Sequence, residues 1–254
     1  MKRAALIALL AACTASTSDY PTRPGGGGGV IVGGGGSGGT TGDGGVGDGG
    51  DGDAGVSVSG RVCILKDLRQ PTLCDTNQDA SKVSVSIGGR SPASPPARTG
   101  EFTILAPLGT DLVWHATGVN FTRSAMPFGT DNLVPIVPLA LYSDLLLQNM
   151  VTLLAEGQGS VVVRAVTGAA PAVGVSATTT LVTANVVPLY DADTSSTDWR
   201  ELGPTQTHGV LWFPGVNDTT TPARITLTRT GGTPVVMSVN VEEQTITFLT
   251  QDMP

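Results

Sequence analysis

The sequence is poor in charged and aromatic residues, and these shortages exclude several classes of protein. Only 14% of the 254 residues are charged, 4% are aromatic, and the formal net charge is −7. Such a chain lacks the basic surface that nucleic-acid binding requires, so we expect no nucleic-acid partner. The apolar run from Ala4 to Ala12 is far shorter than the roughly 20 residues that span a bilayer. A transmembrane helix is therefore excluded at this end of the chain.

Residue types that carry catalysis or hold metals are also scarce. The chain contains two histidines, His115 and His208, and three cysteines. A Gly-x-Ser-x-Gly elbow, a His-Glu-x-x-His helix and a P-loop are all absent from the sequence. Each histidine is best interpreted as a surface strand residue rather than a catalyst. We therefore expect no enzyme activity, no cofactor and no metal site.

The N-terminus carries the strongest local motif. Lys2 and Arg3 precede the apolar run, which ends in Leu-Ala-Ala-Cys at Cys13. This ending resembles the lipobox of bacterial lipoproteins, and the resemblance implies a signal peptide over 1–12 and acylation, palmitate included, of Cys13. The alternative is an ordinary secretory signal with an incidental cysteine. Because Thr14 rather than Asp follows the cysteine, we favour the outer membrane over the inner one.

The next segment, 13–55, is dominated by glycine. Nineteen of the 35 glycines lie between Gly25 and Gly55, with aspartates interspersed toward the end. High backbone entropy and self-repelling charge predict a disordered tether. Calcium binding by the Gly-Asp repeats is the alternative, but those loops need a regularly placed large apolar residue, and only Val46 is available.

From Val56 onward, apolar residues recur at period two, which is the pattern of half-buried strands separated by Gly and Pro turns. In the first half these positions are Val56, Val58, Val62 and Ile64; Val83, Val85 and Ile87; Phe102, Ile104 and Ala106; Leu112, Trp114 and Ala116; and Val119 and Phe121. In the second half they are Val161, Val163 and Ala165; Val173, Val175 and Ala177; Val210 to Phe213; Ile225 and Leu227; Val235 to Val241; and Ile246 to Phe248. This pattern predicts an all-β fold.

The second half repeats the plan of the first. Gly60-Arg61-Val62 has a counterpart in Gly159-Ser160-Val161, and Thr99-Gly100-Glu101-Phe102 has one in His208-Gly209-Val210-Leu211. We interpret 56–142 and 158–254 as two diverged copies of one domain.

Two stretches carry a resemblance to a known module: TGEFTILAPLGTDLVWHATG at 99–118 and PAVGVSATTT at 171–180. They resemble the carboxypeptidase regulatory-like, transthyretin-like β-sandwich. The resemblance implies two non-catalytic, transthyretin-like or immunoglobulin-like Greek-key sandwiches. The first copy departs from the pattern by an insertion at 66–80, and the second by a long loop after Val187.

The segment between the copies, 143–157, predicts a short connecting helix. Leu146, Met150, Leu153 and Leu154 share one helical face, Ser143 can cap the N-terminus, and Gly157 can end the segment. A continuous buried strand is the alternative, because short apolar runs are ambiguous.

Of the three cysteines, one lies in the predicted lipobox and two lie in the predicted β-rich region. With Cys13 assigned to lipid, Cys63 and Cys74 remain, and an exported protein meets an oxidising compartment. We predict a disulfide between them, with Cys63 facing away from the core because it alternates with Val62 and Ile64. Zinc is the rival ligand, but no Cys-x-x-Cys pair or nearby His supports it.

One predicted loop combines aromatic and acidic groups: Tyr190, Asp191, Asp193 and Trp199. These residues could bind a sugar by ring stacking and hydroxyl recognition. In the alternative, which we favour, the two rings cap the edge of the core and the acids keep the loop soluble.

Three functions follow from these features. A non-catalytic envelope lipoprotein with a structural or protein-interaction role agrees with every strong signal, with the membrane and an envelope protein or glycan as partners. A carbohydrate- or peptidoglycan-binding module is second. A hydrolase is third, because it needs residues that the sequence does not provide.

Overall fold

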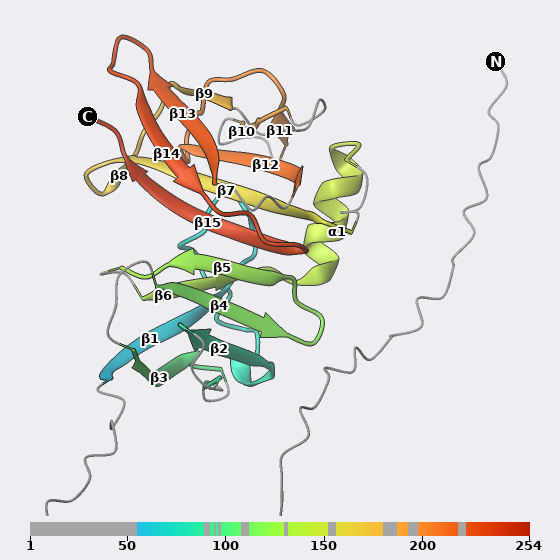
Figure 1. Cartoon of the computed structure of the whole chain (residues 1–254). Helices are drawn as coiled ribbons and strands as arrows, with labels where there is room; N and C mark the ends of the chain where they lie inside the picture. Colours follow the sequence, from blue (N-terminus) through green and yellow to red (C-terminus); the bar gives the residue numbers. More distant parts are fainter. Residues whose placement is uncertain are drawn as a thin grey trace, which may run out of the picture. The chain divides into compact units, whose positions relative to one another are not determined.

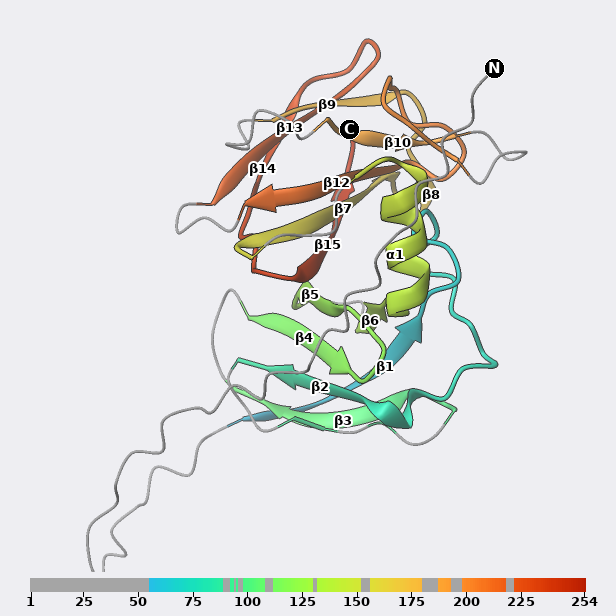
Figure 2. The same cartoon turned by 90° about the vertical axis from the view of Figure 1, so that its right-hand side faces the viewer.

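The computed structural model describes residues 55–88, 92–93, 95, 98–107, 112–129, 132–151, 156–179, 187–192, 198–217 and 222–254. The predicted signal peptide, Cys13 and the glycine-rich segment up to residue 54 lie outside these residues, as does Asp193. The described residues, all from 55 onward, belong to one compact unit. Figures 1 and 2 show this unit in two views.

Short strands dominate the unit, so the all-β prediction is confirmed. The first half contains β1 (Val56–Ile64), a 3-10 turn (Ala80–Lys82), β2 (Val83–Ile87), β3 (Glu101–Ala106), β4 (Val113–Gly118), β5 (Arg123–Pro127) and β6 (Leu133–Ile136). Helix α1 (Leu139–Gln148) follows. The second half contains β7 (Gln158–Thr167), β8 (Ala170–Pro171), β9 (Val175–Thr179), β10 (Leu189–Asp191), β11 (Trp199–Arg200), β12 (Val210–Asn217), β13 (Ala223–Arg229), β14 (Val235–Val239) and β15 (Thr245–Asp252).

The two halves share one pattern of strand pairing. In the first half, β1 pairs antiparallel with β3 and parallel with β6, while β4 pairs antiparallel with β2 and β5. In the second half, β7 pairs antiparallel with β12 and parallel with β15, while β13 pairs antiparallel with β9 and β14. Strand for strand, β5 therefore corresponds to β14, and β6 corresponds to β15.

One sheet runs through both halves. Within the described residues, β15 of the second half pairs in parallel with β5 of the first, giving the strand order β11-β10-β12-β7-β15-β5-β4-β2. The other two sheets, β3-β1-β6 and β14-β13-β9, each cover one end of this long sheet (Figure 1). The halves thus meet edge to edge, through backbone hydrogen bonds.

Each pair of facing sheets encloses an apolar core. In the first half Trp114 is fully buried, and its ring meets that of Phe102 edge-on at a centroid distance of 5.4 Å. In the second half the core is built mainly from alternate residues of β7, β12 and β13. This burial explains the period-two pattern of these strands, because each alternate side chain points between the sheets.

A third apolar cluster lies on the other face of the long sheet. There α1 and the loop after β1 pack against β7, β12 and β15, and Figure 2 shows α1 beside these strands. Trp212 is fully buried in this cluster. The long sheet is therefore covered on both faces where it passes α1.

Helix α1 differs from the predicted helix. It begins at Leu139 after Pro138 and ends at Gln148, and its buried residues are Tyr142, Leu145 and Leu146. Ser143 therefore lies inside the helix and does not cap it. Met150 is 95% exposed, so its assignment to the packed face is wrong. Leu153 and Leu154, assigned to the same face, lie outside the described residues. The helix ends early because Asn149 caps it, donating from both its backbone and its side chain to the Leu145 carbonyl.

Two further expectations need correction. Val173, expected on a half-buried strand, lies in a turn before β9 and is 52% exposed. Val119 and Phe121 do not form a strand: Val119 lies in a turn and Phe121 makes an isolated bridge to Pro138. The next strands, β5 and β6, are not among the predicted strands, and they carry no clear alternation. Ser124 and Ala125 of β5 are both buried although successive side chains of a strand point to opposite faces, so both faces of the long sheet are covered at this point.

Candidate functional site

The predicted aromatic and acidic loop folds into β10 and β11, with its rings turned inward. Trp199 is 7% exposed, and its ring packs on that of Trp212 at a centroid distance of 5.3 Å. Tyr190 is 4% exposed, and its hydroxyl lies 3.2 Å from the Ala177 backbone nitrogen of β9, from which it accepts a hydrogen bond. Both rings are therefore part of the core, and neither presents a face on which a sugar could stack.

Asp191 is also buried, contrary to the expectation that it keeps the loop soluble. Its carboxylate accepts hydrogen bonds from the backbone nitrogens of Gln206 at 2.9 Å, His208 at 2.6 Å and Val210 at 3.3 Å. Three N–H donors are enough to replace the water that a buried carboxylate loses. Asp191 therefore fixes the course of the chain that leads into β12. The sequence does not indicate this role, because the residues that follow Asp191 are typical of a turn.

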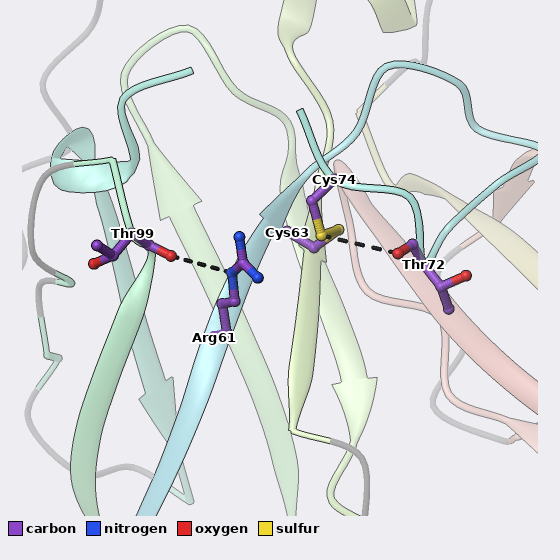
Figure 3. The surroundings of a disulfide bond; sticks show 5 residues. All are labelled: Arg61, Cys63, Thr72, Cys74 and Thr99. Atoms are coloured by element: carbon purple, nitrogen blue, oxygen red, sulfur yellow. Dashed lines mark hydrogen bonds between the residues drawn. A yellow bond between two sulfur atoms is a disulfide. The ribbon is translucent and has the colours of Figure 1, made fainter. Parts of the chain in front are cut away.

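The predicted disulfide between Cys63 and Cys74 is present, with a Cα–Cα distance of 4.8 Å (Figure 3). Cys63 is fully buried, so the expectation that it faces away from the core is only half right. Its side chain does point opposite to Val62 and Ile64, but that face of β1 is covered by α1 and by the loop itself. The alternation along β1 predicted the direction of the Cys63 side chain but not the elements that cover it.

Charged pairs hold the cross-linked loop after β1. Arg69 is 6% exposed and makes two hydrogen bonds with the Asp67 carboxylate, at 3.0 and 2.6 Å. Although burial opposes it, the interactions with Arg69 lower the pKa of Asp67. Lys66 reaches Asp75 at 3.2 Å across the base of the loop. With the disulfide, these pairs make the loop a fixed part of the structure.

His115 forms an ion pair across the two halves. Its Nε2 atom, on β4, lies 2.9 Å from Oε1 of Glu242, which precedes β15. The hydrogen bond to Glu242 raises the pKa of His115, against the effect of burial. The pair joins one residue from each half, which is the geometry of a structural link between them. His208 uses its backbone nitrogen to bind Asp191.

A groove that no sequence motif indicates runs beside the N-terminal end of α1. It consists of two neighbouring cavities of about 580 and 340 Å³ that share Phe121, Leu139 and Ser143. Lys82 and Asp79 lie at one end, and Arg123 lies at the other. The three shared residues offer an apolar surface, from Phe121 and Leu139, and the hydroxyl of Ser143.

Tyr142 closes the inner side of this groove. Its ring lies on α1 and meets the Trp212 ring at a centroid distance of 6.0 Å. Burial raises the pKa of its hydroxyl to about 12, and among the described residues the hydroxyl has no hydrogen-bond partner. Ser160 in turn accepts a hydrogen bond from the Trp212 indole nitrogen at 2.7 Å. This bond links β12 to β7 within the long sheet, while the contact between the Tyr142 and Trp212 rings joins α1 to the sheet.

Comparisons with known proteins identify no family. No protein-family model matches the chain, and no curated protein matches it. Among the residues that the structure describes, no group of three or more His, Cys, Asp and Glu could hold a metal ion. Nor does any helix in this part of the chain have the length and apolar character needed to cross a membrane.

Proposed function

We propose that this protein is a lipid-anchored component of the bacterial envelope, without catalytic activity, whose β-rich region has a structural or protein-binding role. The observation that carries the proposal is the N-terminal sequence: two basic residues, a short apolar run, and Leu-Ala-Ala before Cys13. In lipoproteins such a cysteine becomes the acylated first residue of the mature chain. Because Thr14 follows it, the outer membrane is the proposed location.

The disulfide supports export. Bonds of this kind form and persist in oxidising compartments and are rare in the cytosol. Cys63 and Cys74 are bonded in a buried position, where the bond fixes the loop against β1 and α1. A protein with this cross-link is suited to the periplasm or the cell surface.

The composition of 14–55 suits a spacer between the anchor and the folded region. Glycine dominates the segment, and large apolar side chains are few. A coil of this length has a root-mean-square end-to-end distance of roughly 35–40 Å. The spacer would place the β-rich region beyond the lipid headgroups, where it can meet other envelope components.

The repeated strand pairing supports the further interpretation that the halves are two transthyretin-like sandwiches. Modules of that family are non-catalytic, and the sequence contains only two histidines and no Gly-x-Ser-x-Gly, His-Glu-x-x-His or P-loop motif. The β5–β15 pairing, α1 and the His115–Glu242 pair hold the halves together. A rigid two-part body of this kind fits a structural or protein-binding role.

The test is the substitution Cys13→Ser in cells that process lipoproteins. The native chain should enter the detergent phase in a phase partition, and mass spectrometry should find its first residue to be an acylated Cys13. Cys13→Ser should remain uncut and leave the detergent phase. Thr14→Ser is the matched control and should behave as the native chain. A native chain that starts at another residue without acyl groups would show an ordinary secretory signal and refute the anchor.

A further inference from the structure

The three sheets in the described part of the chain have six edge strands, and three of these contain residues that oppose pairing with another chain. β6 contains Pro135, which has no N–H to donate. β3 contains Glu101 and β11 contains Arg200, and charges on an edge strand disfavour the approach of a second strand.

Two other edges are capped by the protein itself. On β2, Val85 exchanges both of its backbone hydrogen bonds with Ala93, at 2.8 and 2.7 Å. On β9, Val175 is bonded in the same way to the backbone and hydroxyl of Thr205. The Tyr190 hydroxyl caps the next outward group of β9, the N–H of Ala177.

The sixth edge strand, β14, has none of these protections. It reads Val-Val-Met-Ser-Val and contains neither a charge nor a proline. Val236 is 59% exposed. Within the described residues, β14 pairs only with β13, and the backbone bonds outside the strand ladders do not reach it.

Strand alternation identifies which backbone groups of β14 face outward. The backbone groups of Ala177 point away from β13, because they bond to Tyr190. Those of its partner on β13, Leu227, must then point toward β14 and bond Val235. By the same alternation, the N–H and C=O groups of Val236 and Ser238 point to the open edge.

The corresponding edge in the first half is already occupied. β5 is the counterpart of β14, and its outer edge pairs with β15 through Arg123 to Ala125. This fold therefore accepts an added strand at this position. A second copy cannot present β15 in the same way, because β15 is paired on both sides, and Pro135 interrupts β6, the counterpart of β15.

We propose that β14 is a self-association edge: it pairs antiparallel with β14 of a second copy, about a two-fold axis at Met237. Val236 then lies opposite the second copy's Ser238, and each such pair exchanges two backbone hydrogen bonds. The two three-stranded sheets would become one sheet of six strands. The proposal rests on the strand geometry and not on the lipid anchor.

Charge selects the antiparallel direction. Glu242 and Glu243 follow β14, whereas Gly231 and Gly232 precede it. Antiparallel pairing about Met237 directs each acidic pair toward the second copy's glycines. Parallel pairing would instead bring the four carboxylates together, and like charges side by side are destabilising.

Cysteine cross-linking tests the register. Val236→Cys and Ser238→Cys are made separately in the full chain, and the parent chain controls for any reaction of Cys13. Mixing the two variants under mild oxidation should give a disulfide-linked dimer, because opposite residues in a strand pair lie about 5.5 Å apart. Each variant alone should cross-link much less, because its two cysteines are diagonal. Equal cross-linking in all three samples, or none in the mixture, would overturn the proposal.

Sedimentation equilibrium of the full chain in a density-matched mild detergent tests the edge independently. Val236→Lys should weaken the dimer about tenfold or more. Leu105→Lys on β3 is the matched control, since Leu105 is 47% exposed on another edge strand, and it should leave the dimer unchanged. Circular dichroism confirms that both variants fold. A parent chain that is monomeric at every concentration, or equal effects of the two variants, would exclude the edge as the interface.

Discussion

His115 and Glu242 join the two halves of the protein through a side-chain contact: Nε2 of His115 lies 2.9 Å from one carboxylate oxygen of Glu242 and 3.2 Å from the other. The two residues stand on either side of β5, one on β4 and the other just before β15. The contact therefore crosses the same junction that the β5–β15 backbone pairing forms.

This pair predicts a pH-dependent stability. The hydrogen bond to Glu242 raises the pKa of His115 above 6.5, so its contribution is complete below about pH 6.5 and is lost as the pH rises through the folded-state pKa. The hydrogen bond to His115 lowers the pKa of Glu242 below 4.5, so its contribution is complete above about pH 4.5 and is lost as the pH falls through the lowered pKa. The pair should stabilise the fold most between these values.

The size of the effect is limited by solvent. The side chains are 37% and 46% exposed, so we expect a contribution of about 0.5–1 kcal/mol. Urea unfolding at pH 5.5 and 8.5 should show this difference in the native chain and not in His115→Gln. Glu242→Gln should remove it equally, and the double variant should add nothing further. If His115→Gln keeps the native pH dependence, the pair does not link the halves energetically.

The second prediction concerns the buried carboxylate of Asp191. Asp191→Asn replaces one acceptor oxygen with an amide group and removes the charge that three N–H groups face. We expect a loss of about 3 kcal/mol in unfolding free energy. The amide protons of Gln206 and His208 should also exchange faster with solvent. Asp144→Asn, at an exposed position of α1, is the control and should change stability by less than about 0.5 kcal/mol.

The third prediction concerns Trp199, the residue that separates a sugar site from a core position. Because Trp199 is buried against Trp212, Trp199→Ala should cost about 3–5 kcal/mol and lower the melting temperature by roughly 10 °C. Val173→Ala, at a 52% exposed position, is the control. Loss of binding to an envelope glycan with an unchanged melting temperature would restore the sugar-binding interpretation.

The sequence predicted the strands that have one face in the core between the two sheets of each half. Val83, Val85 and Ile87 form β2 as expected, because their side chains point into one core while Ser84 and Ser86 stay partly exposed. Period two is a reliable signal wherever a strand has one buried face and one wet face. It fails for β5 and β6, because consecutive residues of these strands are buried on opposite faces.

The remaining features depend on contacts between distant parts of the chain. The pairing of β5 with β15 joins residues more than a hundred positions apart, and no local pattern specifies it. Asp191 resembles any turn aspartate until the chain that leads into β12 folds over it. The direction of Cys63 followed from alternation, but its burial depends on α1. Local pattern therefore fixed element type, while tertiary packing fixed the site.

The last prediction tests whether the two halves repeat one backbone design. Gly100 and Gly209 have positive φ angles of 71° and 66°, and their carbonyls accept hydrogen bonds from the backbone nitrogens of Val62 and Ala165. A Cβ atom on Gly100 would lie 2.7 Å from the Val62 carbonyl oxygen, and one on Gly209 would lie 2.6 Å from that of Ala165. Both glycines thus allow the same close approach of two strands.

Alanine at either position should be costly for two reasons, the left-handed backbone and the collision with a carbonyl that is fixed in a sheet. Gly168→Ala separates the two, because Gly168 has φ 62° but no atom within 4 Å of its would-be Cβ. We expect about 1 kcal/mol for Gly168→Ala and at least about 2 kcal/mol for Gly100→Ala and for Gly209→Ala, measured by urea unfolding. Equal costs at all three positions would mean that the strands can separate to admit a methyl group, and the proposed equivalence of the two glycines would then have no energetic basis.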